Sequence, residues 1–379
     1  MLDVLVAGAG PAGAIASLVL ARAGARVLVV DRDEFPRDKL CGDTLNPGAV
    51  ALLASLGLHG GPLAGALPLA GMVVTGPLAA VEARYPRGVA GLALTRRALD
   101  AWLLDQAVRA GARFESGLVV RAPLLEDSRA HPVVRGLQLA RRGDAARTIR
   151  LPAILTIAAD GRRSVAARAL GLTHHPQAPR RWAYGTYATG IAATRDVGEM
   201  HIRSGFYLGI APLGGGCCNV CVVTSTRPVG SAPLDVIRRA LASDPRLRHR
   251  FANATLDPEV RVLGPLAVDA WACGADGLLL AGDAAGFVDP MTGDGLHLAM
   301  RGAVLAAEEA LRVLVDGKFS VAPERLRAAR QQEFGKKLRF NRFLRRVVGS
   351  PAAINLAAGG AHIVPGLVRR AVQYAGDAA

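Results

Sequence analysis

Three separated groups of glycine and aspartate residues have the types and spacing of a nucleotide-binding site. The first is Gly8-Ala9-Gly10-Pro11-Ala12-Gly13, the second is Asp160-Gly161, and the third runs from Gly282-Asp283 to Gly295. Glycines let backbone N–H groups approach phosphate oxygens, and aspartates accept hydrogen bonds from sugar hydroxyls. Together, the three groups predict a site for a dinucleotide.

The first glycine run lies where a strand is expected to turn into a helix. Residues 4–7 are apolar and predict a short buried strand, and residues 14–23 have helical composition. In that context Gly8 permits a tight turn, Gly10 lets the backbone approach a pyrophosphate, and Gly13 lets the helix pack closely on the strand. The cofactor-binding residues predicted here are Gly8, Gly10, Pro11, Ala12 and Gly13.

An acidic residue ends the second predicted strand. Residues 26–30 form an apolar run that is followed by Asp31. A carboxylate about 20 residues after such glycines is placed to bind ribose hydroxyls. We assign Asp31 and the adjacent Arg32 to the cofactor site. This fingerprint alone does not separate NAD from FAD.

Composition sets the outer limits on fold and partners. The 379 residues, 51% of them apolar, predict one large domain or two interleaved domains. A net charge of +15 would permit nucleic-acid binding, but only four of the 46 basic residues are lysine and aromatic residues make up 4%. We therefore predict a dispersed basic surface and no nucleic-acid partner.

Cysteine number and the N-terminal sequence bear on compartment. Five irregularly spaced cysteines do not form a disulfide framework, which favours a reducing cytoplasm. Residues 2–21 are apolar but lack a basic start and contain the glycine run, so we interpret them as part of the nucleotide-binding unit.

Basic residues and a cysteine follow the second predicted strand. The loop at 35–43 contains Lys39, Cys41 and Gly42, and basic neighbours would favour a reactive thiolate at Cys41, although a small packing residue would look the same. Further on, Thr95 is a candidate N-cap for a helix at 98–110. Arg96 beside this helix start indicates an anionic partner such as a phosphate.

The middle of the chain predicts two antiparallel sheets. Residues 118–155 alternate in the pattern of a meander, and 154–159 read as a separate buried strand that ends at Asp160-Gly161. That pair suits a close approach to a ligand, or simply a capped helix at 165–170. Residues 182–225 alternate again and predict the second sheet.

Three cysteines in the second predicted sheet raise the question of a metal. Cys217, Cys218 and Cys221 lack further cysteine or histidine residues at zinc spacing, and Cys221 lies in a strand-like run. We therefore interpret them as packing residues and predict no metal site.

The third group is the most specific of the three. A strand at 277–281 precedes it and a helix at 296–315 follows it. Asp283 is placed to bind ribityl hydroxyls, and a helix starting near Gly295 presents its positive end to the N1/O2 edge of a flavin. We predict FAD as the cofactor, with this group contributing Gly282, Asp283, Pro290, Gly293, Gly295 and Leu296.

These motifs resemble the glutathione-reductase-type FAD proteins, and within them the geranylgeranyl reductase family, whose relatives include flavin-dependent halogenases and aromatic hydroxylases. The resemblance spans about residues 1 to 345. It implies an α/β fold with an FAD-binding Rossmann domain, an interleaved antiparallel-sheet substrate domain and C-terminal helices. We expect the FAD-binding domain at 1–75, 92–170 and 265–316, the substrate domain at 76–91 and 171–264, and the helical segment at 317–379.

The resemblance also implies roles for individual residues. Asp31 would hold the adenosine ribose, Arg96 would contact FAD, and residues 290–295 would line the isoalloxazine. Cys41 would lie near the flavin as a catalytic residue, and Tyr207 is the second catalytic candidate. The family's aromatic-rich signature is altered here, because Tyr207 and a proline at 212 are kept while the tryptophan and phenylalanine are lost. That change would widen or reshape the pocket.

The C-terminal region allows two interpretations. Residues 336–346 hold six basic residues among apolar ones, and 352–368 form an apolar segment broken by glycine and proline. This pattern suits a helix on an anionic membrane surface, or equally a helix that covers the substrate pocket with its basic face in solvent. A transmembrane span is not expected.

We therefore expect an FAD-dependent oxidoreductase that reduces carbon–carbon double bonds of a hydrophobic prenyl or polyketide-type lipid. NAD(P)H or a reduced electron carrier would supply the electrons, since no second nucleotide fingerprint is present. The alternatives are an FAD-dependent monooxygenase of aromatic or polyketide substrates, and a membrane-surface flavin-binding protein without turnover. The sequence does not indicate the oligomeric state.

Overall fold

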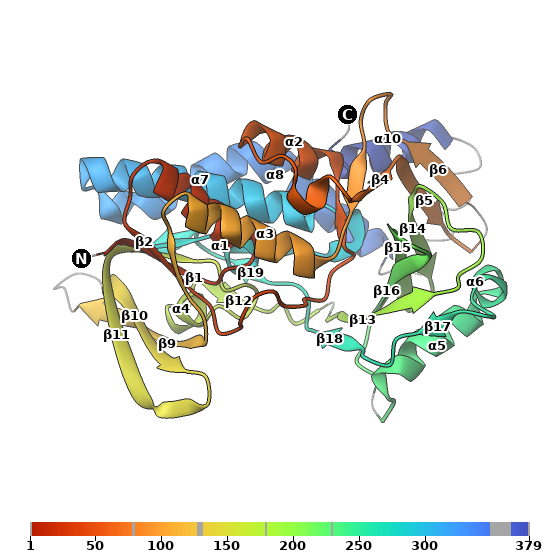
Figure 1. The fold of residues 1–379 in the computed structure, drawn as a ribbon, viewed down its shortest axis with the longest axis horizontal. Helices are drawn as coiled ribbons and strands as arrows, with labels where there is room; N and C mark the ends of the chain where they lie inside the picture. The colour runs from red at the N-terminus through yellow and green to blue at the C-terminus, as the bar shows by residue number, and fades with distance from the viewer. Residues whose placement is uncertain are drawn as a thin grey trace.

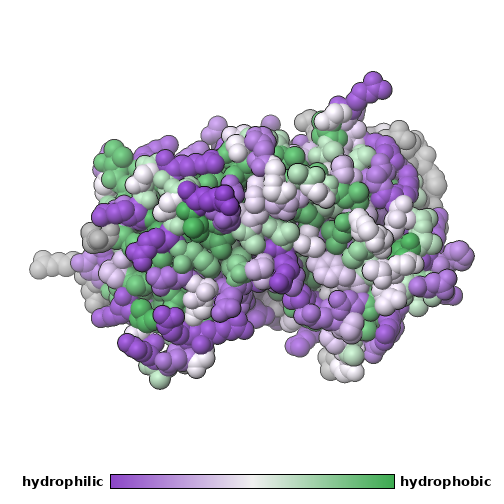
Figure 2. All heavy atoms as spheres, in the orientation of Figure 1, coloured by the Kyte–Doolittle hydropathy of each residue, from purple (hydrophilic) through white to green (hydrophobic). Residues whose placement is uncertain are grey.

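The structure is a computed structural model that describes residues 2–77, 80–126, 132–178, 180–228, 230–348 and 365–377. A helix-covered parallel sheet lies on one side of the molecule, and a second, antiparallel sheet lies on the other (Figure 1). Hydrophilic residues are interspersed with apolar ones over the visible face (Figure 2).

The first sheet has eight strands in the order β20-β21-β11-β1-β2-β8, with β10 paired to β11 and β9 paired to β10. The pairs β1·β11, β1·β2, β2·β8 and β11·β21 are parallel. The strands are β1 (Leu2–Ala7), β2 (Val27–Val30), β8 (Arg113–Glu115), β9 (Leu118–Glu126), β10 (Val133–Arg141), β11 (Asp144–Ala158), β20 (Gly274–Ala275) and β21 (Leu278–Leu280).

Alternating side chains of β1 explain why this sheet is covered on both faces. Val4 and Val6 pack into one apolar cluster with the helices, whereas Leu5 and Ala7 pack into another with β9, β10 and β11. The result is three layers, with helices, parallel sheet and meander in that order. The principal helices are α1 (Pro11–Arg22), α2 (Pro47–Ser55), α3 (Arg96–Arg109), α4 (Val165–Ala169), α7 (Gly295–Asp316) and α8 (Ala322–Val348).

Most predicted elements of this domain are present, with one correction. Thr95 caps α3 as predicted, because its side chain accepts a hydrogen bond from the Ala98 N–H at 3.3 Å. The meander at 118–155 and the strand at 154–159 were predicted separately, but a single strand, β11, serves both. Its first part pairs antiparallel with β10 and its last part pairs parallel with β1.

The predicted second sheet is confirmed and has the order β17-β13-β16-β15-β14-β5-β6, with β18 paired to β13. Helices α5 (Pro233–Ser243) and α6 (Pro245–Arg250) pack on one face. The strands are β5 (Gly71–Thr75), β6 (Ala80–Arg84), β13 (Trp182–Thr189), β14 (Gly198–Arg203), β15 (Phe206–Gly214), β16 (Cys217–Thr224), β17 (Thr255–Leu256) and β18 (Arg261–Leu263).

Strand β5 bears on the domain boundary. It pairs parallel with β14 and antiparallel with β6, so residues 71–75 belong to the second sheet. We propose that the boundary lies near residue 70 rather than at 75. Two small sheets complete the fold, formed by β3 (Thr44–Leu45), β7 (Gly91–Ala93) and β4 (Leu67–Leu69), and by β12 (Thr173–His174) and β19 (Asp269–Ala270).

The C-terminal helix α10 (Pro365–Ala375) is fixed by a buried lysine. Lys337 in α8 donates to the Tyr374 and Ala375 carbonyls at 2.6 and 2.8 Å and to Asp377 at 2.6 Å. These bonds satisfy carbonyls that a helix end leaves unpaired. The apolar segment predicted at 352–368 lies outside the described residues up to 364. No helix in the described part of the chain is long and apolar enough to cross a membrane.

A buried ion-pair network joins strand β14 of the second sheet to the end of helix α6. Arg250 donates to both carboxylate oxygens of Glu199 at 2.6 and 2.8 Å, and His201 Nε2 lies 2.9 Å from the same carboxylate. Burial disfavours the charged carboxylate, but these hydrogen bonds outweigh it and lower the pKa of Glu199 to about 2. The network therefore stabilises the fold only while Glu199 is ionised.

We expect Glu199→Gln to lower the free energy of unfolding at neutral pH by about 3 kcal/mol, because Arg250 loses its buried partner. The folded pKa lies below the usual 4.5, so this stabilisation is complete above pH 4.5 and is lost as the pH falls toward 2. Denaturant unfolding followed by circular dichroism measures it. The matched control is Glu82→Gln, on an exposed pair, which should change stability by less than about 1 kcal/mol. Equal stability of wild type and Glu199→Gln at neutral pH would contradict the prediction.

Candidate active site

A cavity of about 650 Å³ lies between the first sheet and the second. Of the predicted site residues, it is lined by Gly8, Gly10, Pro11, Ala12, Asp31, Arg32, Lys39, Cys41, Gly42, Arg96, Asp160, Gly161, Gly282, Asp283, Pro290, Gly293, Gly295 and Leu296. Gly13 and Tyr207 are the predicted site residues that do not line it. The fold thus brings the three separated groups to one space.

The glycines of the first run have different structural reasons. Gly8 has φ +93°, and a β-carbon there would lie 2.5 Å from the Ala159 carbonyl oxygen. A β-carbon on Gly13 would overlap the Gly8 carbonyl, so the close packing behind the cavity wall requires glycine at this position. Gly10 has an ordinary extended backbone, and a β-carbon on it would lie 3.4 Å from the Arg37 side chain. Its missing side chain therefore leaves cavity space at the start of α1.

The carboxylate of Asp31 stabilises the glycine-containing turn after β1 and the backbone that follows β2. One carboxylate oxygen accepts from the Ala9 N–H at 2.7 Å and the other accepts from the Asp33 N–H at 2.9 Å. The side chain is buried yet lines the cavity. Since each carboxylate oxygen has further acceptor capacity, Asp31 can also accept from a ribose hydroxyl.

Cationic side chains gather at the cavity. Arg96 donates two hydrogen bonds to the buried Asp100, at 2.6 and 2.7 Å, and Arg37 donates to the same carboxylate at 3.0 Å. Burial and the positive charges of Arg37, Arg32, Arg96 and Arg162 lower the pKa of Lys39 to about 8. One carboxylate between two guanidiniums leaves an excess of positive charge, which suits an anionic ligand.

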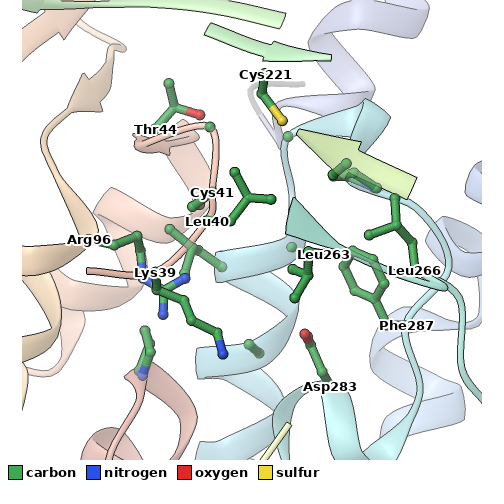
Figure 3. Close-up of a pocket in the computed structure, with 18 of the residues that line it drawn as sticks. Lys39, Leu40, Cys41, Thr44, Arg96, Cys221, Leu263, Leu266, Asp283 and Phe287 are labelled. Atoms are coloured by element: carbon green, nitrogen blue, oxygen red, sulfur yellow. The ribbon is translucent and has the colours of Figure 1, made fainter. Parts of the chain in front are cut away.

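Two cavity-lining carboxylates are left with hydrogen-bonding capacity. Asp160 Oδ1 is buried and has no hydrogen-bond partner among the described residues. Among the described residues, the Asp283 carboxylate has one basic side chain within 4 Å, Arg162, whose Nε lies 3.9 Å away, and burial raises the pKa of this aspartate. Figure 3 shows Lys39 and Asp283 directed toward the same space. Polyol hydroxyls of a dinucleotide would satisfy these acceptors, so FAD fits the residues present.

The loop that carries Cys41 is fastened by the buried Asp43. This residue has φ +52°, and its carboxylate accepts from the Arg96 N–H at 3.0 Å, the Tyr187 hydroxyl at 2.9 Å and the Asn219 amide at 2.9 Å. These donors belong to α3, β13 and β16. Burial raises the pKa of the Cys41 thiol, although Arg96 opposes the shift. The shift favours the thiol form of Cys41 over the reactive thiolate that its basic neighbours led us to expect.

The Tyr207 side chain binds the third cofactor segment and does not line the cavity. Its hydroxyl donates to Asp289 at 2.5 Å, and the other oxygen of Asp289 accepts from Arg181 at 2.7 Å. Asp289 also accepts from the Met291 N–H at 3.1 Å and so caps the turn at 290–292. We propose that Tyr207 acts as a positioning residue rather than in the catalytic role expected from the sequence.

The part of the cavity next to the second sheet is apolar. Figure 3 shows Leu40, Leu263, Leu266 and Phe287 around it, with the Cys221 sulfur directed inward. Burial raises the pKa of Cys221 to about 12. Cys218 points to the opposite face of β16 and packs in the core there. Among the described residues no group of three metal-ligating side chains occurs.

Several residues of the site escaped prediction from sequence. Arg37, Asp43, Asp100 and Asp289 are joined to the predicted residues by the hydrogen bonds given above. Asp43 directly follows Cys41-Gly42 and has a left-handed backbone conformation, which aspartate adopts more readily than most residues. An aspartate at this point of the loop was therefore the signal that the sequence offered. Asp100 lies inside a helix among apolar residues, and only its burial against Arg37 and Arg96 reveals its role.

The three-layer nucleotide-binding fold, the glycine run and the cationic cavity define an FAD-binding flavoprotein. A family model described as an FAD binding domain matches residues 1–319. The chain is also 33% identical over 328 residues to menaquinone reductase from Mycolicibacterium smegmatis, which covers 81% of this chain and 75% of that protein. Digeranylgeranylglycerophospholipid reductase 2 from Methanopyrus kandleri is 30% identical over 353 residues, covering 89% and 84%.

Solved structures agree on the fold. A geranylgeranyl bacteriochlorophyll reductase-like protein from Thermoplasma acidophilum superposes with a TM-score of 0.80 at 20% identity, covering 94% of this chain and 90% of that one. A flavin-dependent brominase gives 0.84 at 20% identity, covering 99% and 93%. The chain belongs to the FAD-binding-domain family that includes these reductases, and it is an FAD-dependent oxidoreductase. The predicted fold class and the resemblance to geranylgeranyl reductases are confirmed.

We expect Gly10→Leu to weaken FAD binding by about a hundredfold or more, because the new side chain would occupy the cavity at the start of α1. The fold should persist, since the Gly10 backbone suits any residue. Flavin absorbance after reconstitution and gel filtration measures the loss, and circular dichroism monitors the fold. Gly65→Leu is the control, because Gly65 is exposed with open space around it. Normal FAD content in Gly10→Leu would remove Gly10 from the site.

Proposed function

We propose that this protein reduces carbon–carbon double bonds of a hydrophobic, unsaturated lipid with electrons from bound FAD. The observation that carries the proposal is the continuity of one cavity from the cofactor residues to an apolar chamber against the second sheet. The names of the two reductase relatives support it, since both describe the reduction of lipids or lipid-like quinones. When bound, FAD would supply hydride transfer from its isoalloxazine.

The protein residues would orient FAD and the substrate toward each other and would donate the proton. Residues 290–295, held through Asp289 by Tyr207 and Arg181, would line the isoalloxazine. The apolar side chains of the second sheet would hold the substrate and exclude water. Cys41 lines the cavity, and its raised pKa favours the protonated thiol, so it is our candidate donor to the carbon opposite the hydride.

Electrons would reach FAD from NAD(P)H or a reduced electron carrier. The sequence holds a single glycine fingerprint, at residues 8–13, and this fingerprint borders the cavity that we propose to bind FAD. A donor would therefore bind transiently rather than in a dedicated dinucleotide domain.

Helix α8 supports a further proposal on location. Its inner face covers the cavity, where Leu344 lines the wall and Phe340 packs edge-on against Tyr374 with ring centroids 5.1 Å apart. Its outer face exposes Phe343 and four cations, Lys336, Arg339, Arg342 and Arg346. We propose that a cytoplasmic protein rests this face on an anionic membrane and there collects its substrate.

Anaerobic substrate reduction tests the function. The FAD-loaded protein is reduced by light without oxygen and mixed with menaquinone or with a digeranylgeranyl lipid, while flavin absorbance reports reoxidation. We expect reoxidation without oxygen and a product that keeps two added hydrogen atoms on its unsaturated chain after air has oxidised any quinol back to the quinone. Reaction only with oxygen, giving a product with one added oxygen atom, would indicate a monooxygenase instead. FAD binding without either reaction would indicate a flavin-binding protein without turnover.

Cys41→Ser should slow that anaerobic reoxidation by about a hundredfold, because a buried hydroxyl is a much weaker acid than the thiol. FAD content should stay normal, since serine fits the space of cysteine. Cys217→Ser is the matched control, on the same face of β16 as Cys221 but outside the cavity lining. If both variants reoxidise at the wild-type rate, Cys41 is not the proton donor.

A further inference from the structure

The second sheet presents a row of paired residues to the cavity. Gly185 of β13 is opposite Cys221 of β16, Cys221 is opposite Gly209 of β15, and Gly209 is opposite Met200 of β14. Because paired residues share a face, these four side-chain positions point the same way. Cys221, Gly209 and Met200 line the cavity. This row is the floor on which a substrate would lie.

Neighbouring side chains fill the space above two glycines of this face. A β-carbon on Gly185 would overlap Leu40, which comes from the loop that carries Cys41. A β-carbon on Gly198 would lie 2.5 Å from the sulfur of Met72, from the adjacent strand β5. The protein itself therefore occupies both hollows.

Among the described residues, the space above Gly209 is open. Within 4 Å, a β-carbon there would meet two backbone oxygens of this part of the chain, of Glu199 at 3.9 Å and of Cys221 at 4.0 Å, and none of its side chains. Gly209 also lies away from the left-handed region of backbone conformation, so the backbone does not require glycine. Glycine inside a strand weakens the strand, and its presence here serves the cavity rather than the fold.

The cavity onto which this hollow opens has a sulfur-rich lining. Met72, Met200 and Met291, three of the five methionines in the chain, line the cavity together with Cys221. Thioether sulfur is polarisable and makes favourable contacts with aromatic rings. The flat floor of peptide groups and the sulfur-rich rim are complementary to a planar ring, whereas a thin flexible chain would leave the hollow partly empty.

We propose that Gly209 is a specificity-determining residue and that its hollow receives a planar aromatic or quinonoid ring of the substrate. This inference rests on the proposed function only in placing an apolar substrate in the cavity. It adds that the substrate is a ring-bearing lipid, whose apolar tail lies along Leu263, Leu266 and Phe287. A bulkier residue at position 209 excludes the ring and spares the tail.

Ligand binding to the oxidised, FAD-loaded protein tests the proposal without turnover. Isothermal titration calorimetry compares menadione, a ring without a tail, with geranylgeraniol, a tail without a ring. The variants are Gly209→Ala and Gly209→Leu, and the control is Leu208→Ile, on the opposite face of β15. We expect Gly209→Leu to weaken menadione binding about tenfold or more and geranylgeraniol binding less than about twofold. Gly209→Ala should have a smaller effect in the same direction.

The outcomes separate this proposal from the proposed function. Unchanged menadione affinity in both Gly209 variants, with normal FAD content, would overturn the proposal, as would an equal loss for geranylgeraniol. If Gly209→Leu does not fold, Gly209→Ala decides, because its thermal unfolding midpoint should equal or exceed the wild-type value. Gly209-dependent menadione binding in a protein that reduces no lipid would refute the proposed function and support the ring site. Wild-type rates of menaquinone reduction by Gly209→Leu would refute the ring site and support the proposed function.

Discussion

The buried carboxylate of Asp43 is the interaction on which the site depends. It accepts one hydrogen bond from the start of α3 in the FAD-binding domain and two from β13 and β16 in the second sheet. These bonds fix the loop that carries Cys41 and thereby set the relative position of cofactor and substrate regions. A residue at φ +52° has a conformational cost, which three hydrogen bonds to a buried carboxylate can offset.

A second buried carboxylate, Asp289, fixes the opposite wall of the cavity in the same way. Tyr207 in the second sheet and Arg181, just before β13, hold it while it caps the turn that is expected to line the isoalloxazine. Each wall of the cavity is therefore fixed through an aspartate bound by residues of both regions. This arrangement explains why aspartates and arginines distant in sequence are buried here at all, since unpaired they would destabilise the fold.

Local sequence signals were sufficient for much of the fold, because strand, glycine turn and helix follow one another within residues 4–23. The cofactor residues were predictable for the same reason. Tyr207 could not be assigned from sequence, because only the folded chain brings it to Asp289, 82 positions away. The extent of β11 was also missed, since a strand that changes from antiparallel to parallel partners carries two burial patterns in one run.

That change of partners within β11 has a consequence for how the chain folds. The β10–β11 hairpin joins residues close in sequence, whereas β1 and β21 must reach the last part of β11 from far along the chain in both directions. Local pairs form faster because closing a short loop costs less entropy. We infer that the hairpin forms first. The last part of β11, which extends beyond the hairpin, then provides the strand with which β1 and β21 pair in parallel.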